Sequence, residues 1–138
     1  MGTSKLKVTG INHVVLHVTD LDRSRAFYMD ALGFIDRGPV PGMRAAFLRC
    51  GMQGLDPFET AGCDVHGGEE MNHIALNVDV ADVESLVACL PGAEIDGFEV
   101  TPRNSVFIAD PDGHRIEMLP ISAGERDHER ESARALGR

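Results

Sequence analysis

Two histidines and one glutamate have the residue types and the spacing of a metal site. His13 and His73 stand 60 positions apart in two similar segments, so they occupy equivalent places in a repeat. Glu117 lies near the end of the second copy. Two imidazoles and one carboxylate on neighbouring strands can hold a divalent ion and leave coordination positions open for water or substrate. The sequence therefore predicts all three as metal ligands, with Glu117 also catalytic.

The same repeat suggests a fourth ligand. Residues 58–60, with Glu59 at the centre, occupy the place in the first half of the repeat that residues 116–118 occupy in the second half. This correspondence predicts Glu59 as a further ligand. Either Glu59 or a metal-bound hydroxide would then serve as the general base. A solvated loop carboxylate beside Pro57 is the alternative for Glu59.

Four further side chains are expected to line the substrate cavity: His17, Asn77, Phe107 and Arg115. His17 lies two residues after His13, and Asn77 holds the corresponding position in the second copy. For His17 the alternative to substrate contact is a polar residue in the wall of the cavity. Arg103 and Arg115 could each meet an anionic substrate, or could be solvated or ion-paired.

The repeated segments predict two equivalent strands. Residues 11–18 resemble residues 71–78, and both contain Asn-His followed by alternating aliphatic positions. Side chains of a strand alternate between its faces. Each strand therefore has one aliphatic face, suited to pack under a helix, and one face that carries the histidine.

A helix is predicted after each of these strands. Residues 20–32 show helical spacing of apolar and small side chains, with Thr19 or Asp20 as the N-cap and Gly33 in position to end the helix. Residues 81–90 show the same spacing, and the Pro-Gly pair that follows stops the second helix.

Three short strands are predicted after each helix, at 34–37, 44–50 and about 55–60, and again at 94–98, 105–109 and 115–119. Residues 110–113, Asp-Pro-Asp-Gly, predict a tight turn between the last two. Pro57 cannot donate to a ladder, so its strand is expected to be short or at a sheet edge. His66 and His114 fall in linker and turn, and both are expected at the surface.

These elements predict an α+β fold made of two βαβββ modules. The first module covers residues from about 10 to 60 and the second from about 71 to 120. A polar, glycine-rich linker at 61–70 joins them. Residues 1–9 form an N-terminal extension, and residues 121–138 form a charged tail to which no chemistry is assigned.

Composition excludes several classes of protein. The 138 residues are 43% hydrophobic, which suffices for one core. No apolar run approaches the roughly 20 residues of a membrane span, and residues 1–7 lack the apolar centre of a signal peptide. The net charge of −9 disfavours nucleic acid as a partner. Three cysteines without a CxxC pair fit reduced thiols, so a cytoplasmic protein is expected.

Two stretches, residues 13–34 and 106–117, resemble the vicinal-oxygen-chelate (VOC) superfamily of glyoxalases, bleomycin-resistance proteins and extradiol dioxygenases. The resemblance extends over residues 10 to 120. It implies that the two modules build an open, barrel-like cup with the helices outside. It also implies that His13, His73 and Glu117 are the metal positions, with Glu59 at a variable fourth one.

The resemblance further implies a divalent ion as cofactor: iron(II), manganese, nickel, zinc or cobalt. In this family two vicinal oxygens of a small substrate chelate the ion, which stabilises an enolate-like or oxyanion intermediate. The implied activity is that of a glyoxalase-like lyase or isomerase, or of a dioxygenase. Because open sheets leave edges to cover, a homodimer is also expected.

Departures from particular members narrow the reaction. Phe107 stands where extradiol enzymes have a tyrosine, and residues 97–106 contain no histidine. His17 is near the arginine position of glutathione-dependent glyoxalases, and the chain has no tryptophan. Fosfomycin-inactivating relatives add basic loops, which this acidic composition does not suggest.

A metal-free drug-binding protein of the bleomycin-resistance type is the alternative function, although the three retained ligand positions argue against it. A metal-binding protein that catalyses no reaction is a third possible function.

Overall fold

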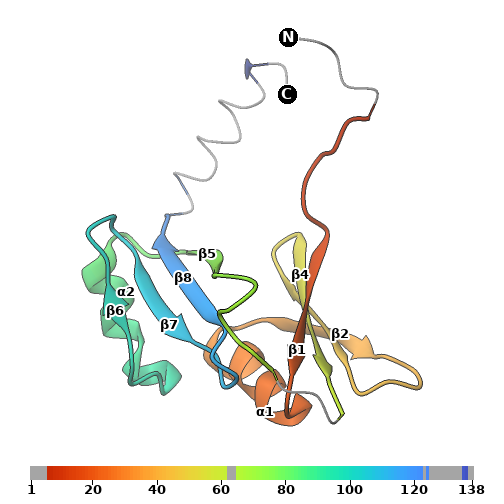
Figure 1. Cartoon of the computed structure of the whole chain (residues 1–138). Coiled ribbons are helices and arrows are strands. Elements are labelled where there is room, and N and C mark those ends of the chain that lie inside the picture. Colours follow the sequence, from red (N-terminus) through yellow and green to blue (C-terminus); the bar gives the residue numbers. More distant parts are fainter. Residues whose placement is uncertain (1–5, 62–64, 123, 125–134, 137–138) are drawn as a thin grey trace. The chain divides into compact units, whose positions relative to one another are not determined.

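The computed structural model describes residues 6–61, 65–122, 124 and 135–136. The chain divides into two compact units, Met1–Asp64 and Val65–Arg138, and each is treated by itself. Before the tail, the described residues of each unit form one four-stranded mixed sheet and one α-helix (Figure 1). The predicted α+β fold of two βαβββ modules is therefore confirmed. Most of the predicted tail lies outside the described residues.

Unit 1 contains the strands β1 (His13–Val18), β2 (Ile35–Pro39), β3 (Ala46–Cys50) and β4 (Gln53–Glu59), and the helix α1 (Leu21–Ala26), which continues as a π-helical segment η1 (Phe27–Ala31). The strand order is β1-β4-β3-β2, with β1 parallel to β4 and the other pairs antiparallel.

Unit 2 contains the strands β5 (Ile74–Val78), β6 (Glu99–Val100), β7 (Val106–Ala109) and β8 (Arg115–Pro120), the helix α2 (Val83–Cys89) and a 3-10 turn η2 (Pro91–Ala93). The strand order is β5-β8-β7-β6, with β5 parallel to β8. Both units thus have the same topology, as the repeat predicts.

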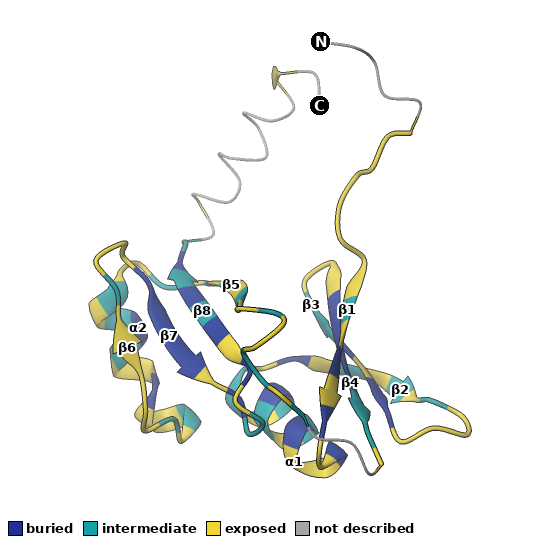
Figure 2. Ribbon diagram, in the orientation of Figure 1, coloured by how far each residue is buried: buried dark blue, intermediate teal, exposed yellow. Residues whose placement is uncertain are grey.

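The alternation predicted for β1 is present. Leu16 and Val18 are buried, whereas His13, Val15 and His17 are exposed on the other face (Figure 2). In the same unit α1 contributes the buried Ser24 and η1 the buried Tyr28. The aliphatic face of β1 therefore contributes to the core of unit 1, and the histidine face stays exposed within that unit. The corresponding aliphatic residues of β5 are half-buried.

The predicted helix ends follow local capping chemistry. Asp20 caps α1, because its side chain accepts a hydrogen bond from the backbone N–H of Arg23. Gly33 has a φ of +76°, as expected of the residue that ends a helix. In unit 2 the cap is Asp82, which accepts from the N–H of Ser85. No helix among the described residues is long and apolar enough to cross a membrane.

The strand predicted at 94–98 is wrong. The chain instead continues beyond α2 into η2, and Glu94 adopts a left-handed conformation with a φ of 59°. The N–H of Glu94 donates to the carbonyl of Pro91, and that of Ile95 donates to Leu90. These bonds close a turn where a strand was expected, and the strand forms only at Glu99–Val100.

The prediction that Pro57 forces a short or edge strand is also wrong. β4 has seven residues and lies between β1 and β3. Glu59 donates its N–H toward β3, so the N–H that Pro57 lacks would face the same side. The N–H of Leu48, on β3, donates to the side chain of Asp56 beside this position (3.1 Å). The nitrogen of Pro57 faces β3, so the ladder with β1 loses no donor, and β4 stays inside the sheet.

His114 is buried, contrary to its predicted place at the surface, whereas His66 is exposed as predicted. In the β7–β8 turn, His114 Nδ1 lies 2.8 Å from Asp110 Oδ2. The other oxygen of Asp110 accepts from the backbone N–H groups of Asp112 and His114. The hydrogen bond to Asp110 raises the pKa of His114, although burial opposes the shift.

This pair predicts a pH-dependent contribution to stability. A histidine whose pKa is raised on folding stabilises most fully below its unfolded pKa of about 6.5, and the contribution is lost as the pH rises through the folded pKa. The loss of unfolding free energy caused by His114→Gln should therefore be larger at about pH 5.5 than at about pH 8.5. Urea unfolding of both proteins across this range measures it. A difference that does not change with pH would contradict it.

Candidate metal centre

Unit 2 brings together two of the predicted metal ligands. His73 immediately precedes β5, and Glu117 lies on the adjacent parallel strand β8, paired with Ala75. His73 Nε2 lies 3.5 Å from Glu117 Oε1. Two donors about 2.1 Å from one ion are separated by roughly 3.0–3.4 Å at octahedral or tetrahedral angles. The donor types and their separation therefore fit a single divalent cation.

The ring of His73 is oriented by its neighbour in the sequence. Its Nδ1 lies 2.7 Å from Asn72 Oδ1, an acceptor to which Nδ1 can donate, and Nε2 is the ring nitrogen turned toward Glu117. His13 and Asn12 repeat this contact at the same distance in unit 1. Such hydrogen bonds to the distal ring nitrogen orient metal-binding histidines. The two Asn-His pairs were visible in the repeat, but the sequence reasoning gave the asparagines no role.

The carboxylate of Glu117 is held by residues that the sequence reasoning missed. Ser105, which is fully buried, donates its hydroxyl to Glu117 Oε2 at 2.7 Å. The Thr101 hydroxyl lies 2.7 Å from that of Ser105. With one oxygen bound in this way, Oε1 is the oxygen turned to His73. Nothing in the spacing of a serine and a threonine before β7 could have indicated this chain of contacts.

His13 lies at the start of β1 in unit 1, with its side chain on the exposed face of the sheet. Within either unit, the described residues contain no group of three or more His, Cys, Asp or Glu side chains that could hold a metal ion. Unit 2 by itself thus brings together two of the predicted ligands. The metal-binding roles of His13, His73 and Glu117 stay predictions.

The strand registers correct the correspondence on which Glu59 was predicted. Val15 pairs with Asp56 in unit 1 as its repeat equivalent, Ala75, pairs with Glu117 in unit 2. Asp56 is therefore the counterpart of Glu117. Glu59 is three positions further along and pairs with the buried Val18, which places it on the aliphatic, helix-covered face.

Glu59 also has structural partners there. Its Oε2 accepts from the backbone N–H of Leu21, the first residue of α1, at 2.9 Å and from Arg44 at 3.2 Å. These two hydrogen bonds lower the pKa of Glu59. A carboxylate at a helix N-terminus satisfies an otherwise unpaired N–H and interacts favourably with the helix dipole. Its predicted roles as ligand and base stay predictions, and these contacts favour a capping role.

The capping role predicts a variant that separates the two possibilities. Glu59→Ala should lower the melting temperature by a few degrees and leave bound metal unchanged. Because its pKa is lowered on folding, Glu59 stabilises above its ordinary pKa of 4.5, and this stabilisation is lost as the pH falls through the folded pKa. Melting curves and metal analysis provide the readouts, with the exposed Glu70→Ala as control. Loss of metal in Glu59→Ala alone would favour the ligand role.

Two of the predicted lining residues lie beside His73. The Phe107 ring packs edge-on against the His73 ring, with centroids 5.1 Å apart, and the Arg115 guanidinium carbon lies 4.5 Å from the centre of the Phe107 ring. His17 and Asn77 are exposed on the histidine-bearing faces of β1 and β5. Their contact with substrate stays a prediction.

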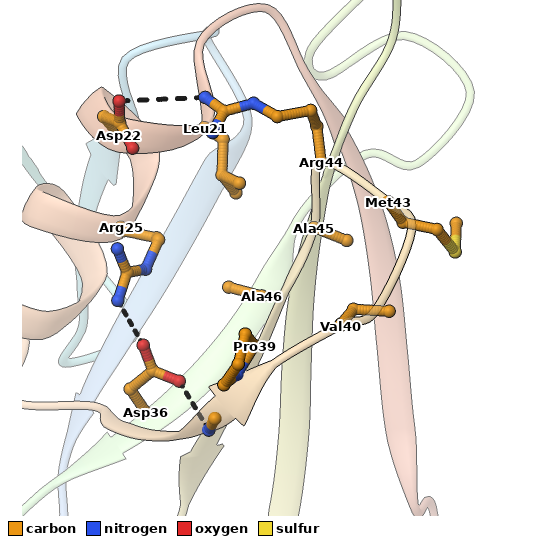
Figure 3. A pocket seen from close by; sticks show the side chains of 11 residues that line it. Leu21, Asp22, Arg25, Asp36, Pro39, Val40, Met43, Arg44, Ala45 and Ala46 are labelled. Carbon is orange, nitrogen blue, oxygen red and sulfur yellow. Dashed lines mark hydrogen bonds and ion pairs between the residues drawn. The ribbon is translucent and has the colours of Figure 1, made fainter.

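A separate pocket of about 240 Å³ lies on the helix side of unit 1 (Figure 3). Its floor includes Ala45 and Ala46, and its rim carries two ion pairs, Arg44 with Asp22 and Arg25 with Asp36. None of the predicted ligands or lining residues contributes to it. This pocket is therefore not part of the candidate metal centre.

Comparison with known proteins agrees with this fold. Residues 10–118 match the family model described as Glyoxalase/Bleomycin resistance protein/Dioxygenase superfamily. The lactoylglutathione lyase of Haemophilus influenzae is 32% identical over 127 residues, covering 79% of this chain and 90% of that protein. The metallothiol transferase FosB of Staphylococcus epidermidis is 27% identical over 121 residues, covering 82% of each.

A solved structure shows the same fold. The fosfomycin resistance protein FosX of Listeria monocytogenes aligns with a TM-score of 0.69 and 19% identity, over 89% of this chain and 99% of that one. The family match spans most of the sequence, from before His13 to just beyond Glu117. The chain belongs to the Glyoxalase/Bleomycin resistance protein/Dioxygenase superfamily.

Proposed function

We propose that this protein is a divalent-metal-dependent enzyme in which His13, His73 and Glu117 hold the ion. Its substrate is a small molecule that presents two vicinal oxygens to the site. The observation that carries the proposal is the 3.5 Å separation of His73 Nε2 and Glu117 Oε1, with the opposite atom of each group already hydrogen-bonded. Such preorganised donors are what a metal site requires.

The named relatives support a metal-dependent enzyme and leave the reaction open. One is a lyase and another a metallothiol transferase, and the family name includes dioxygenases. One scaffold therefore hosts several reactions, and the reaction has to be argued from the site. When bound, a divalent ion would supply Lewis acidity toward substrate oxygens.

The surrounding residues hold the ligands and limit the access of water. Asn72 and Phe107 fix the His73 ring, and Ser105 fixes the Glu117 carboxylate. The side chain of Glu117 is only 14% exposed, so its charge is partly shielded from water. Preorganisation of this kind removes the need to reorder the ligands when the ion or the substrate binds.

Metal analysis of untagged protein tests the proposal. After incubation with iron(II), manganese, nickel, zinc or cobalt and removal of free ion, the wild type should retain about one ion per chain. The variants His13→Ala, His73→Ala and Glu117→Gln should each lose most of it. His66→Ala, which removes an exposed histidine, should behave as the wild type. A wild type without stoichiometric metal, or ligand variants that keep it, would show the proposal to be wrong.

Turnover is then tested on metal-loaded protein with catechols, hemithioacetals of 2-oxoaldehydes and 2-oxoacids. Conversion that requires the ion and disappears in His73→Ala is the expected result. Tight drug binding that is equal with and without metal would instead favour the metal-free binding function. The predicted homodimer is measured on the same samples by light scattering.

A further inference from the structure

Each unit places an arginine close to its predicted metal histidine, but the two arginines differ in their partners. In unit 1 a Cβ at Gly54 would lie 1.9 Å from Arg49 Nη1 and 2.8 Å from His13 Cβ, so the guanidinium occupies the space beside His13. Arg49 Nη1 also lies 3.2 Å from Asp56 Oδ1, and the Asp56 side chain is 2% exposed. A buried carboxylate therefore balances the charge of Arg49.

In unit 2 the arginine near the histidine is Arg115, on β8. It stacks over the Phe107 ring and donates from Nη1 to Asn72 Oδ1 at 3.3 Å. Within the part of the chain that the structure describes, no carboxylate forms an ion pair with Arg115. The nearby Glu117 is engaged by Ser105 and His73. The guanidinium of Arg115 is thus held in place by neutral groups, without an ion pair to any described residue.

The contacts of Arg115 tie it to the metal histidine. Asn72 Oδ1 accepts from both Arg115 Nη1 and His73 Nδ1, and the Phe107 ring touches both side chains. The hydrogen bond to Asn72 uses only one of the guanidinium's N–H donors. The remaining donors form a planar fork, which matches the oxygens of a carboxylate, phosphonate or phosphate group.

We propose that Arg115 binds an acidic group of the substrate, so that the substrate of this site is a small oxyanion. This inference rests on the proposed function. A divalent ion with two neutral imidazoles and one carboxylate has a net charge of about +1, and Arg115 adds a second positive charge nearby. The site therefore attracts anions although the chain as a whole carries a charge of −9.

Calorimetric titration of metal-loaded protein with three matched probes tests this. Glycolate and hydroxymethylphosphonate carry an acidic group next to a hydroxyl, whereas glycolamide has the same carbon skeleton as glycolate without the charge. At least one of the anions should bind about tenfold or more tightly than glycolamide. The anion that binds more tightly identifies the acidic group as carboxylate or phosphonate.

Variants assign the effect to Arg115. Arg115→Gln should weaken binding of that anion about tenfold or more and leave glycolamide binding unchanged, and Arg115→Lys should be intermediate. Arg103→Gln removes the same charge from an exposed turn and should have little effect. Failure of both anions to bind in preference to glycolamide, or equal losses in Arg103→Gln and Arg115→Gln, would overturn the inference. Metal content is measured on every sample, so loss of the ion itself counts against the proposed function instead.

Discussion

Replacing Asp56 by alanine is expected to lower the free energy of unfolding by about 2–4 kcal/mol and the melting temperature by roughly 5–15 °C. Asp56 is 1% exposed, and its Oδ1 accepts from the backbone N–H of Leu48 and from Arg49. Alanine would remove the buried carboxylate that accepts from the Leu48 N–H and from Arg49. Arg49 is partly exposed and can be rehydrated, so it contributes the smaller share.

Two further variants sharpen this prediction. Asp56→Asn retains an acceptor oxygen and should lose about half as much, since only the charge is removed. Asp22→Ala removes an exposed carboxylate that lies 3.7 Å from Arg44, and should change stability by less than about 0.5 kcal/mol. Urea unfolding measures all three. If Asp56→Ala unfolds like Asp22→Ala, the buried hydrogen bonds do not have the assigned importance.

Replacing Ser105 by alanine is expected to weaken metal binding about 10–100-fold, the usual effect of losing a hydrogen bond to a metal ligand. Without the 2.7 Å bond to Oε2, the Glu117 carboxylate can rotate away from His73. A competitive titration with a chelator gives the affinity. The fold should be retained, because the variant removes one hydroxyl and creates little empty volume.

A positioning role for Ser105 is distinguished from a merely structural one by controls. Thr101→Val removes the outer hydroxyl of the chain and should weaken metal binding less than Ser105→Ala. Ser85→Ala makes the same substitution on α2, distant in sequence from the ligands, and should bind metal normally. Unchanged affinity in Ser105→Ala, with stability lowered, would assign the residue to the fold alone.

Features that depend on local sequence were predictable. The Asn-His repeat identified the strands β1 and β5, and Asp20 and Gly33 marked the ends of the first helix, because capping depends on adjacent residues. The alternation along β1 also placed His13 on the exposed face. Glu117 was predicted near a histidine from its place on the last strand and from the family resemblance, and β8 does pair with β5 beside His73.

Features that depend on pairing between distant residues were not predictable in the same way. The correspondence chosen for Glu59 was displaced by three positions, and an odd displacement moves a side chain to the opposite face of a sheet. Pro57 was expected at an edge because the sequence does not show which neighbouring strand its nitrogen faces, and only the ladder on that side loses a donor. The contact of Ser105 with Glu117 spans two strands and leaves no periodic signal.

Asp56 and Glu117 occupy equivalent places, each on the strand next to its unit's histidine. In unit 1 this carboxylate is buried and accepts from the backbone of β3, whereas in unit 2 it is turned toward His73. One position of the module therefore has two different partners, so a substitution should act through stability at Asp56 and through metal binding at Glu117.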